Sequence, residues 1–185
     1  MTAHPRLQAQ CRLDTPLGPM TAAATADGLA GLWFDHQQHH PGELTVPTDP
    51  RQPWLQAAAR ALAAYFGRRP LPALPTLPTL HFDLHGTPFQ RAVWQALLDL
   101  PAGATSTYGR IATAAGSPAA VRAAGAAIGR NPVSIFVPCH RVIGRDGSLT
   151  GYAGGLDRKR ALLRLEGVAL ADETAPLFDD AHAAR

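Results

Sequence analysis

The sequence predicts an α/β N-terminal domain, built from a small antiparallel sheet and one helix, followed by a mostly α-helical C-terminal domain. Short apolar segments separated by turn residues fill residues 11–34, a pattern typical of antiparallel strands. A proline-spaced stretch over residues 68–78 separates this half from a second half of capped helices. We therefore expect an N-terminal domain over residues 1–82, linker included, a C-terminal domain over residues 83–170 and a disordered tail over residues 171–185.

The composition indicates a cytoplasmic protein. Charged residues make up 17% of the 185 residues, below the roughly 25% typical of globular domains, and the formal net charge is +3. This charge mildly favours an anionic partner. The two cysteines lie far apart, do not form a disulfide framework and suit a reducing cytosol. No apolar run approaches the roughly 18 residues that span a bilayer, and the N-terminus has no signal-peptide core, so we expect no membrane contact.

The N-terminal half begins with strand and turn signals. Thr15-Pro16-Leu17-Gly18-Pro19 predicts a turn, and Ala26-Asp27-Gly28 predicts a hairpin between strands at residues 21–24 and 29–34. A helix follows over residues 53–67. Six of its apolar side chains fall on one stripe with the 3.6-residue period, namely Trp54, Leu55, Ala58, Leu62, Tyr65 and Phe66.

Three histidines, His36, His39 and His40, lie in the loop predicted over residues 35–52. Neighbouring histidines raise the question of a metal site. Structural zinc usually needs several thiolates at fixed spacing, and Cys11 stands alone in this half. We therefore predict a solvated loop and no metal.

The second half opens with a well-marked helix. Thr87 is a candidate N-cap, Pro88 occupies the first helical position and Gln90 completes a capping box. The apolar stripe of this helix consists of Phe89, Val93, Leu97 and Leu100.

Two shorter helices then outline a helix-turn-helix. Thr107 caps a helix that ends near Ala115, and Gly116 supplies a turn. Ser117, with Pro118 after it, predicts the start of a second helix that runs to about residue 129. Such helical pairs are also common in ordinary cores, so the outline alone is weak support for DNA binding.

The second of these helices carries almost no large side chains. Besides Arg122 and Ile128 it consists mainly of small residues, namely Ala119, Ala120, Ala123, Ala124, Gly125, Ala126 and Ala127. Reading base edges in the major groove needs several long polar side chains, so this helix suits close, sequence-tolerant contact with a minor groove. Tight packing against a neighbouring element is the alternative interpretation, and part of the helix must do that.

The segment Pro138-Cys139-His140-Arg141-Val142 combines a thiol and an imidazole. It follows an apolar run at residues 133–137 that predicts a short buried strand or extended segment. Glycine-containing stretches follow at residues 143–147 and 151–155. Most lone cysteines are inert packing, but a thiol between a buried segment and flexible loops is also a plausible nucleophile in a tight pocket.

This pentapeptide and six accompanying blocks resemble the O6-alkylguanine-DNA alkyltransferases, the methylated-DNA–protein-cysteine methyltransferases. The blocks are Gly86-Thr87-Pro88-Phe89-Gln90, Tyr108-Gly109, Ala120-Val121-Arg122-Ala123-Ala124-Gly125, Asn131-Pro132, Gly151-Tyr152-Ala153-Gly154-Gly155 and Leu165-Glu166-Gly167 with the intervening spacing. The resemblance implies a ribonuclease H-like N-terminal domain and a helix-turn-helix that enters the minor groove of double-stranded DNA. It also implies that the damaged nucleotide is rotated out of the duplex, which a base buried in the stack requires.

The resemblance assigns a role to each site residue. Cys139 is the alkyl acceptor, His140 and Glu166 activate it, and Asn131 ties the reactive turn together. The expected contacts to substrate and DNA come from Tyr108, Arg122, Val142, Tyr152 and Ala153. Arg122 is the finger that fills the vacated space, and Tyr108 assists rotation and contacts the base. Many relatives carry serine where this chain has Ala153, so only a backbone contact is expected there.

The activating groups can also be argued from the chain itself. Successive residues on extended backbone point to opposite sides, so we expect a bridging water between Cys139 and His140 instead of a direct bond. Glu166 ends a helix predicted over residues 157–165, where a carboxylate opposes the helix dipole. It shares a face with Leu162 and Leu163, so a buried partner such as His140 explains it better than solvent does. A histidine oriented by a carboxylate and acting on a nucleophile is a familiar arrangement.

The sequence thus predicts a monomeric DNA-repair protein that moves the alkyl group of O6-alkylguanine irreversibly to Cys139, once per molecule and without cofactor or metal. Whether O4-alkylthymine is also accepted stays open. A cysteine hydrolase, which would turn over many substrates, is one alternative. A non-catalytic alkyltransferase-like lesion sensor is the other, although such proteins lack the cysteine and usually carry tryptophan instead.

Overall fold

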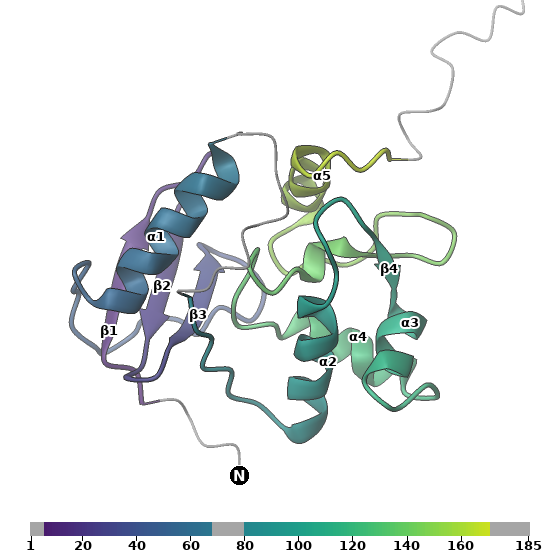
Figure 1. The fold of residues 1–185 in the computed structure, drawn as a ribbon, viewed down its shortest axis with the longest axis horizontal. Helices are drawn as coiled ribbons and strands as arrows, with labels where there is room; N and C mark the ends of the chain where they lie inside the picture. Colours follow the sequence, from purple (N-terminus) through teal and green to yellow (C-terminus); the bar gives the residue numbers. More distant parts are fainter. Residues whose placement is uncertain (1–5, 68–79, 171–185) are drawn as a thin grey trace, which may run out of the picture.

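The computed structural model describes residues 6–67 and 80–170, and its two halves lie side by side (Figure 1). The described N-terminal half consists of β1 (Ala9–Leu13), β2 (Met20–Ala24), β3 (Leu29–Phe34) and α1 (Pro53–Phe66). The C-terminal half consists of α2 (Pro88–Leu98), β4 (Ser106–Thr107), α3 (Tyr108–Ala114), α4 (Val121–Gly129), the 3-10 turn η1 (Cys139–Arg141), β5 (Val142–Ile143) and α5 (Leu156–Leu165). The predicted order, a sheet with one helix followed by a mostly helical half, is confirmed.

The N-terminal sheet forms as its turn signals predict. Its strand order is β1-β2-β3, and both pairs are antiparallel. The N–H of Thr25 donates to the carbonyl of Gly28 at 3.0 Å to close the predicted hairpin, and Gly18 N–H donates to Thr15 at 3.0 Å in the predicted turn. The helix α1 packs over the sheet (Figure 1) and buries the side chains of Leu55, Ala57, Ala58, Ala61, Leu62 and Tyr65.

The strand β3 also holds the C-terminal half. The N–H of Leu32 donates to the carbonyl of Pro132, and the N–H of Ser134 donates back to Leu32, both at 2.8 Å. A second bridge joins Leu29 to Phe82, at the predicted boundary between the two domains. The chain that leads to Cys139 is therefore fixed to the edge of the N-terminal sheet.

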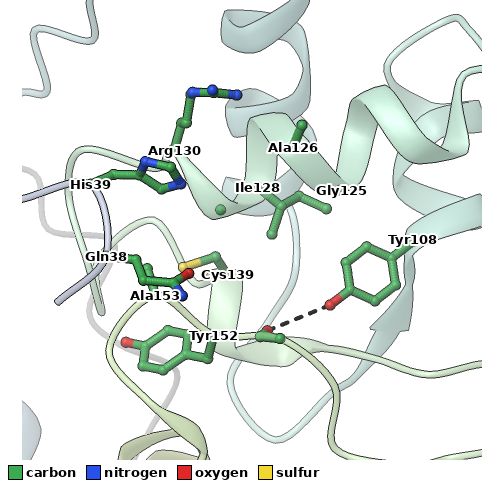
Figure 2. Close-up of a pocket in the computed structure, with 12 residues that line it drawn as sticks. Gln38, His39, Tyr108, Gly125, Ala126, Ile128, Arg130, Cys139, Tyr152 and Ala153 are labelled. Atoms are coloured by element: carbon green, nitrogen blue, oxygen red, sulfur yellow. Dashed lines mark hydrogen bonds between the residues drawn. The ribbon is translucent and has the colours of Figure 1, made fainter.

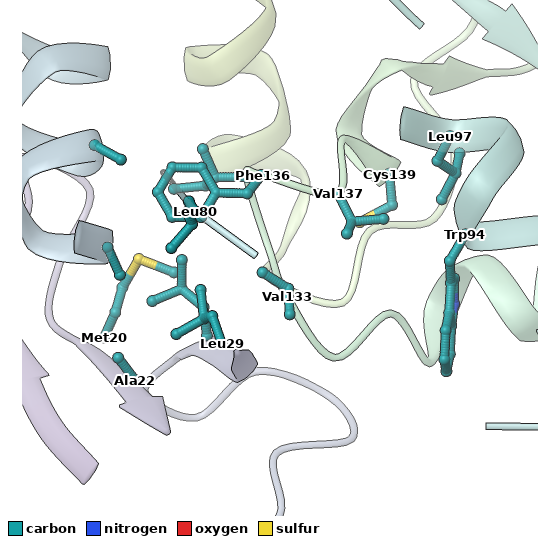
Figure 3. Close-up of a cluster of buried hydrophobic side chains, with 14 of the residues drawn as sticks. Met20, Ala22, Leu29, Leu80, Trp94, Leu97, Val133, Phe136, Val137 and Cys139 are labelled. Atoms are coloured by element: carbon teal, nitrogen blue, oxygen red, sulfur yellow. The ribbon is translucent and has the colours of Figure 1, made fainter. Parts of the chain in front are cut away.

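One hydrophobic cluster joins the two halves (Figure 3). Met20 and Leu29 of the sheet, Leu80, and Val133 and Phe136 of the segment before η1 belong to it, and each is less than 9% exposed. Burial of such side chains is the main stabilising contribution to folding. The predicted boundary at residue 82 stays a prediction, and the predicted proline-rich linker and disordered tail lie outside the described residues.

The helix α2 begins with the predicted capping box. The N–H of Gln90 donates to the Thr87 hydroxyl at 3.2 Å, and the N–H of Thr87 donates to Gln90 Oε1 at 2.9 Å. The indole of Trp94 then donates to the carbonyl of Ala127 at 2.9 Å. This bond fixes α2 against α4.

The helices α3 and α4 form the predicted helix-turn-helix, but α4 begins later than predicted. Its N-cap is Ala120, without a side-chain hydrogen bond, instead of Ser117. The N–H of Ser117 donates to Ala112 at 2.9 Å, and the N–H of Ala120 donates to Ser117 at 2.9 Å. Ser117 and Pro118 therefore belong to a tight turn that closes before the helix begins. Gly116 precedes it with a φ of 77°, a left-handed conformation that favours glycine.

The predicted strand at residues 133–137 is wrong, although its burial is right. Val133 makes a single bridge to Leu32, after which the chain turns and the N–H of Val137 donates to Val133 at 3.0 Å. Ile135 adopts a φ of 73°, which is unusual for a β-branched residue and ends any strand. The following Cys139–Arg141 segment is a 3-10 turn, so the extended backbone assumed for Cys139 and His140 is also wrong.

Two further expectations concern metals and membranes. Within residues 6–67 and 80–170, no group of three or more histidine, cysteine, aspartate or glutamate side chains is arranged to hold a metal ion. In the same ranges, no helix combines the length and apolarity that crossing a bilayer requires.

Candidate active site

A cavity of about 290 Å³ opens beside Cys139 (Figure 2). Its C-terminal walls come from α3, the end of α4 and the loop before α5, and include Tyr108, Ile128, Arg130, Tyr152 and Ala153. Gln38 and His39, from the loop after β3, complete the lining. The site is therefore shared between the two halves of the molecule.

The Cys139 thiol lies at the buried side of this cavity. The residue is 4% exposed, and the side-chain amide of Asn131 donates to Sγ at 3.0 Å. Burial raises the pKa of the thiol, although the Asn131 hydrogen bond and the charge of Lys159 oppose this effect. The resting thiol is therefore protonated at neutral pH and needs a proton acceptor before it can attack.

Asn131 holds the turn that carries the thiol. Its amide nitrogen also donates to the carbonyl of Val137 at 2.7 Å, and its Oδ1 accepts from the N–H of Val133 at 3.0 Å. One buried side chain thus bonds both ends of the turn and the sulfur. This arrangement fixes Sγ relative to the cavity.

His140 is paired with Glu166 and makes no hydrogen bond to the Cys139 sulfur within the described residues. Its Nε2 lies 2.8 Å from Oε1 of Glu166, and its side chain is fully buried. Its Nδ1 is buried and has no hydrogen-bond partner among the protein atoms of the described chain, and no bond joins the ring to Cys139 there. Burial lowers the pKa of His140, and the Glu166 carboxylate opposes this effect. A neutral imidazole with a free Nδ1 can accept a proton.

Glu166 is the C-cap of α5 and collects donors from several directions. Arg141 makes a planar fork to it, Nε to Oε2 and Nη2 to Oε1, both at 2.8 Å. Tyr65 of α1 donates to Oε1 at 2.8 Å. Burial alone would raise the pKa of Glu166, but the hydrogen bonds and charges of His140 and Arg141 hold it well below its usual range.

Lys159 is a buried cation beneath the cavity loop. Its Nζ donates to the carbonyls of Val142 and Thr150 at 2.5 Å each and of Gly151 at 3.3 Å. Burial lowers the pKa of Lys159 to about 8. The three bonds connect the strand after η1 to the loop that lines the cavity, so Lys159 fixes the position of that loop.

Tyr108 and Cys139 lie on different sides of the cavity (Figure 2). Tyr108 begins α3, and its hydroxyl donates to the carbonyl of Thr150 at 3.3 Å. Gly125 of α4 lies beside it, and a Cβ on Gly125 would lie 3.6 Å from its ring. The small residues of α4 therefore leave room for Tyr108 beside the cavity.

The structure does not bring every predicted site residue to the cavity. Arg122 is exposed on α4 and lies outside the lining. Val142 is buried and also lies outside the lining; its N–H donates to the carbonyl of Cys139, and its carbonyl accepts from Lys159.

Two models of one protein family together match most of the chain. The 6-O-methylguanine DNA methyltransferase DNA binding domain matches residues 88–168, and the ribonuclease-like domain of the same family matches residues 12–78. The chain belongs to this family. Among other 6-O-methylguanine DNA methyltransferases, the methylated-DNA–protein-cysteine methyltransferase of Mycobacterium tuberculosis is 46% identical over 154 residues, which are 83% of this chain and 89% of the relative. That of Salmonella typhimurium is 42% identical over 172 residues, covering 86% and 95%.

A solved structure agrees with this assignment. The Mycobacterium tuberculosis OGT in complex with DNA superposes with a TM-score of 0.73 at 44% identity, covering 90% of this chain and 98% of that one. The ribonuclease-like N-terminal fold and the DNA-binding C-terminal fold predicted from sequence are thereby confirmed.

Three residues that hold the site together in this family member, Arg141, Tyr65 and Lys159, are not indicated by the sequence. Arg141 is one residue of the Pro138–Val142 motif, and Tyr65 belongs to the apolar stripe of α1. Lys159 lies in Asp157-Arg158-Lys159-Arg160, a run of charges typical of a solvated helix face. No local signal marks any of the three, because their partners come from distant parts of the chain.

Proposed function

We propose that this protein repairs double-stranded DNA by transferring the alkyl group of O6-alkylguanine to its own Cys139. The observation that carries the proposal is the buried Cys139 thiol at the wall of a cavity, backed by the His140–Glu166 pair at 2.8 Å. The cavity of about 290 Å³ opens beside the thiol, which suits a base that has been rotated out of a duplex. The names of the relatives support the same reaction.

The reaction is an in-line displacement at the alkyl carbon. A bond forms between Sγ of Cys139 and this carbon while the bond from the carbon to guanine O6 breaks. The thiol proton passes to Nδ1 of His140 through a water, and Glu166 stabilises the imidazolium that forms. Guanine takes up one proton as it leaves, with Tyr108 as the donor, which solvent reprotonates. The balance needs no further reactant.

The DNA-binding surface is proposed to be the helix-turn-helix. The side chain of Arg122 projects from α4 outside the cavity, where it can occupy the space left in the stack by the rotated nucleotide. The small residues of α4 allow its backbone to approach the minor groove closely. Tyr152 and the backbone of Ala153 then contact the base inside the cavity.

The proposal also covers the turnover, oligomeric state, location and domain boundaries of the protein. The stable thioether makes each molecule act once, as a monomer in the cytoplasm. The chain divides into domains at residues 1–82 and 83–170, with the first contributing Gln38 and His39 to the cavity.

A titration of product against protein tests the proposal. A duplex with a single O6-methylguanine is incubated with increasing amounts of protein, and the restored guanine is counted at completion. We expect one guanine per protein molecule. Continued turnover would instead indicate a cysteine hydrolase, and binding without any restored guanine would indicate a non-catalytic sensor.

A further inference from the structure

Tyr65 reaches the relay from the other half of the molecule. It lies near the C-terminal end of α1, is 1% exposed and donates its O–H to Oε1 of Glu166 at 2.8 Å. The same oxygen faces Nε2 of His140 at 2.8 Å. The phenol and the imidazole therefore compete for one carboxylate oxygen.

Arg141 already fixes the position of Glu166. Its fork contacts both carboxylate oxygens at 2.8 Å, and the N–H of Gly103 lies 3.5 Å from Oε2. Because the carboxylate is held without Tyr65, the remaining effect of the phenol is electrostatic. A donor to a carboxylate spreads its negative charge and weakens its attraction for a neighbouring imidazolium.

We propose that Tyr65 is a positioning residue that restrains the nucleophile: by donating to Glu166 it makes His140 a weaker proton acceptor and keeps more of Cys139 in the thiol form. This inference rests on the proposed function only in treating Cys139, His140 and Glu166 as the reactive chain. It gives the N-terminal half a direct influence on the chemistry.

The charges around His140 are consistent with this role. Glu166 and Lys159 approach from the α5 side, Arg141 and Cys139 belong to η1, and the Tyr152 ring lies 6.4 Å away between centroids. Burial lowers the pKa of His140, Arg141 and Lys159 lower it further, and Glu166 alone among the charged groups raises it. Any change in the negative charge of the Glu166 carboxylate therefore changes the pKa of His140. Burial and the Glu166 charge raise the pKa of Tyr65, so the phenol stays a donor across the neutral and alkaline range.

Removal of the phenol should increase the reactivity of the thiol. Transfer of the thiol proton to His140 becomes tenfold more favourable for each unit by which the His140 pKa rises. One hydrogen bond to a charged group, partly replaced by the remaining donors, corresponds to a shift of about half a unit to one unit. We therefore expect roughly three- to tenfold more thiolate at neutral pH.

The experiment compares Tyr65→Phe with the unchanged protein and with Thr25→Val. Thr25 is a matched control, because its buried hydroxyl also donates to a carboxylate, Asp83, at 2.6 Å, but outside the relay. Iodoacetamide is the probe, and mass spectrometry of the Cys139 peptide gives the rate from neutral to alkaline pH. Cys139 of Tyr65→Phe should react about three to ten times faster than Cys139 of the unchanged protein at neutral pH. The two rates should become equal at alkaline pH, where Cys139 is fully ionised in both proteins. Thr25→Val should react at the rate of the unchanged protein at every pH, a rate ratio of one.

Two outcomes overturn the inference. A ratio at or below one at neutral pH for Tyr65→Phe shows that the phenol does not restrain the thiol, and a uniform loss of rate shows a purely structural role. If Tyr65→Phe does not fold, 3-fluorotyrosine at this position, a stronger donor of nearly equal size, should slow the reaction at neutral pH, and an unchanged or faster rate contradicts the inference. Since iodoacetamide needs no DNA, failure of the unchanged protein on O6-methylguanine duplex refutes the proposed function separately.

Discussion

Two buried cysteines in one chain differ in what surrounds them. Cys11 lies within β1, is 3% exposed and pairs with Ala22 of β2, whereas Cys139 is 4% exposed and borders the cavity. Burial raises the pKa of both thiols. Only the pKa of Cys139 is also lowered by neighbouring groups, namely Asn131 and Lys159. Burial alone therefore makes a cysteine inert, and the nucleophile is distinguished by an opening and by neighbouring groups that stabilise its thiolate.

The largest expected effect separates the two thiols directly. Cys139→Ala should abolish alkyl transfer, because the acceptor sulfur is gone, while Cys11→Ala should transfer at the rate of the unchanged protein. Transfer of label from an O6-methylguanine duplex measures both. Cys139→Ser should still bind the alkylated duplex, since α4 is intact. Transfer by Cys139→Ala at any measurable rate would contradict the comparison.

The next effect tests the relay that Cys11 lacks. Glu166→Gln should keep the fold, slow alkyl transfer by about 10²–10⁴ and raise the apparent thiol pKa in a rate–pH profile, because His140 becomes a weaker base. Asp83→Asn is the control, since Asp83 also pairs with a histidine, His85 at 2.9 Å, away from the cavity. A Glu166→Gln protein that reacts at full speed near neutral pH would leave the relay without support.

A smaller effect distinguishes the rotation of the base into the cavity from the activation of the thiol. Extrusion of a base costs a few kcal/mol, and each lost 1.4 kcal/mol is tenfold, so Arg122→Ala should react with duplex O6-methylguanine at least roughly tenfold more slowly. The free base O6-benzylguanine needs no extrusion, so its reaction with Cys139 should be nearly unchanged. Single-turnover rates at saturation give this comparison, with Arg60→Ala on α1 as an exposed control that should change neither rate. Equal losses on both substrates would exclude the finger role.

The smallest effect concerns stability. Burial lowers the pKa of His140, so the unfolded chain binds a proton first as the pH falls. Stability contributed by His140 is therefore full above about pH 6.5 and is lost below it at up to about 1.4 kcal/mol per pH unit. Urea unfolding at successive pH values should show this slope in the unchanged protein and a flatter one in His140→Gln. Equal slopes would show that His140 is not neutral in the folded state.

The sequence predicted the elements whose signals are local. The capping box of Thr87 and Gln90 and the hairpin at Ala26-Asp27-Gly28 each depend on residues a few positions apart, and the structure places them as expected. The strand predicted at residues 133–137 is wrong because an apolar run indicates burial but does not distinguish a strand from a buried turn. The helix cap predicted at Ser117 is wrong because serine serves equally well in a turn and at a helix cap.

The candidate site was only partly predictable for a different reason. Tyr65 and Glu166 are 101 positions apart, and Arg141 and Glu166 are 25 apart, so neither pair leaves a periodic signal. Gln37 is similar: its side chain accepts from the Ser134 hydroxyl at 3.1 Å across the two halves. Tertiary packing creates these contacts, and the residue types alone are equally consistent with a core or a solvated face.

The position of the transferred group tests the central claim most directly. The protein is mixed with an equimolar duplex containing O6-methylguanine, digested and mapped by mass spectrometry. We predict one methyl group on the peptide that contains Cys139 and none on the peptide that contains Cys11. A methyl group on Cys11, or restored guanine with both cysteines unmodified, would contradict the account.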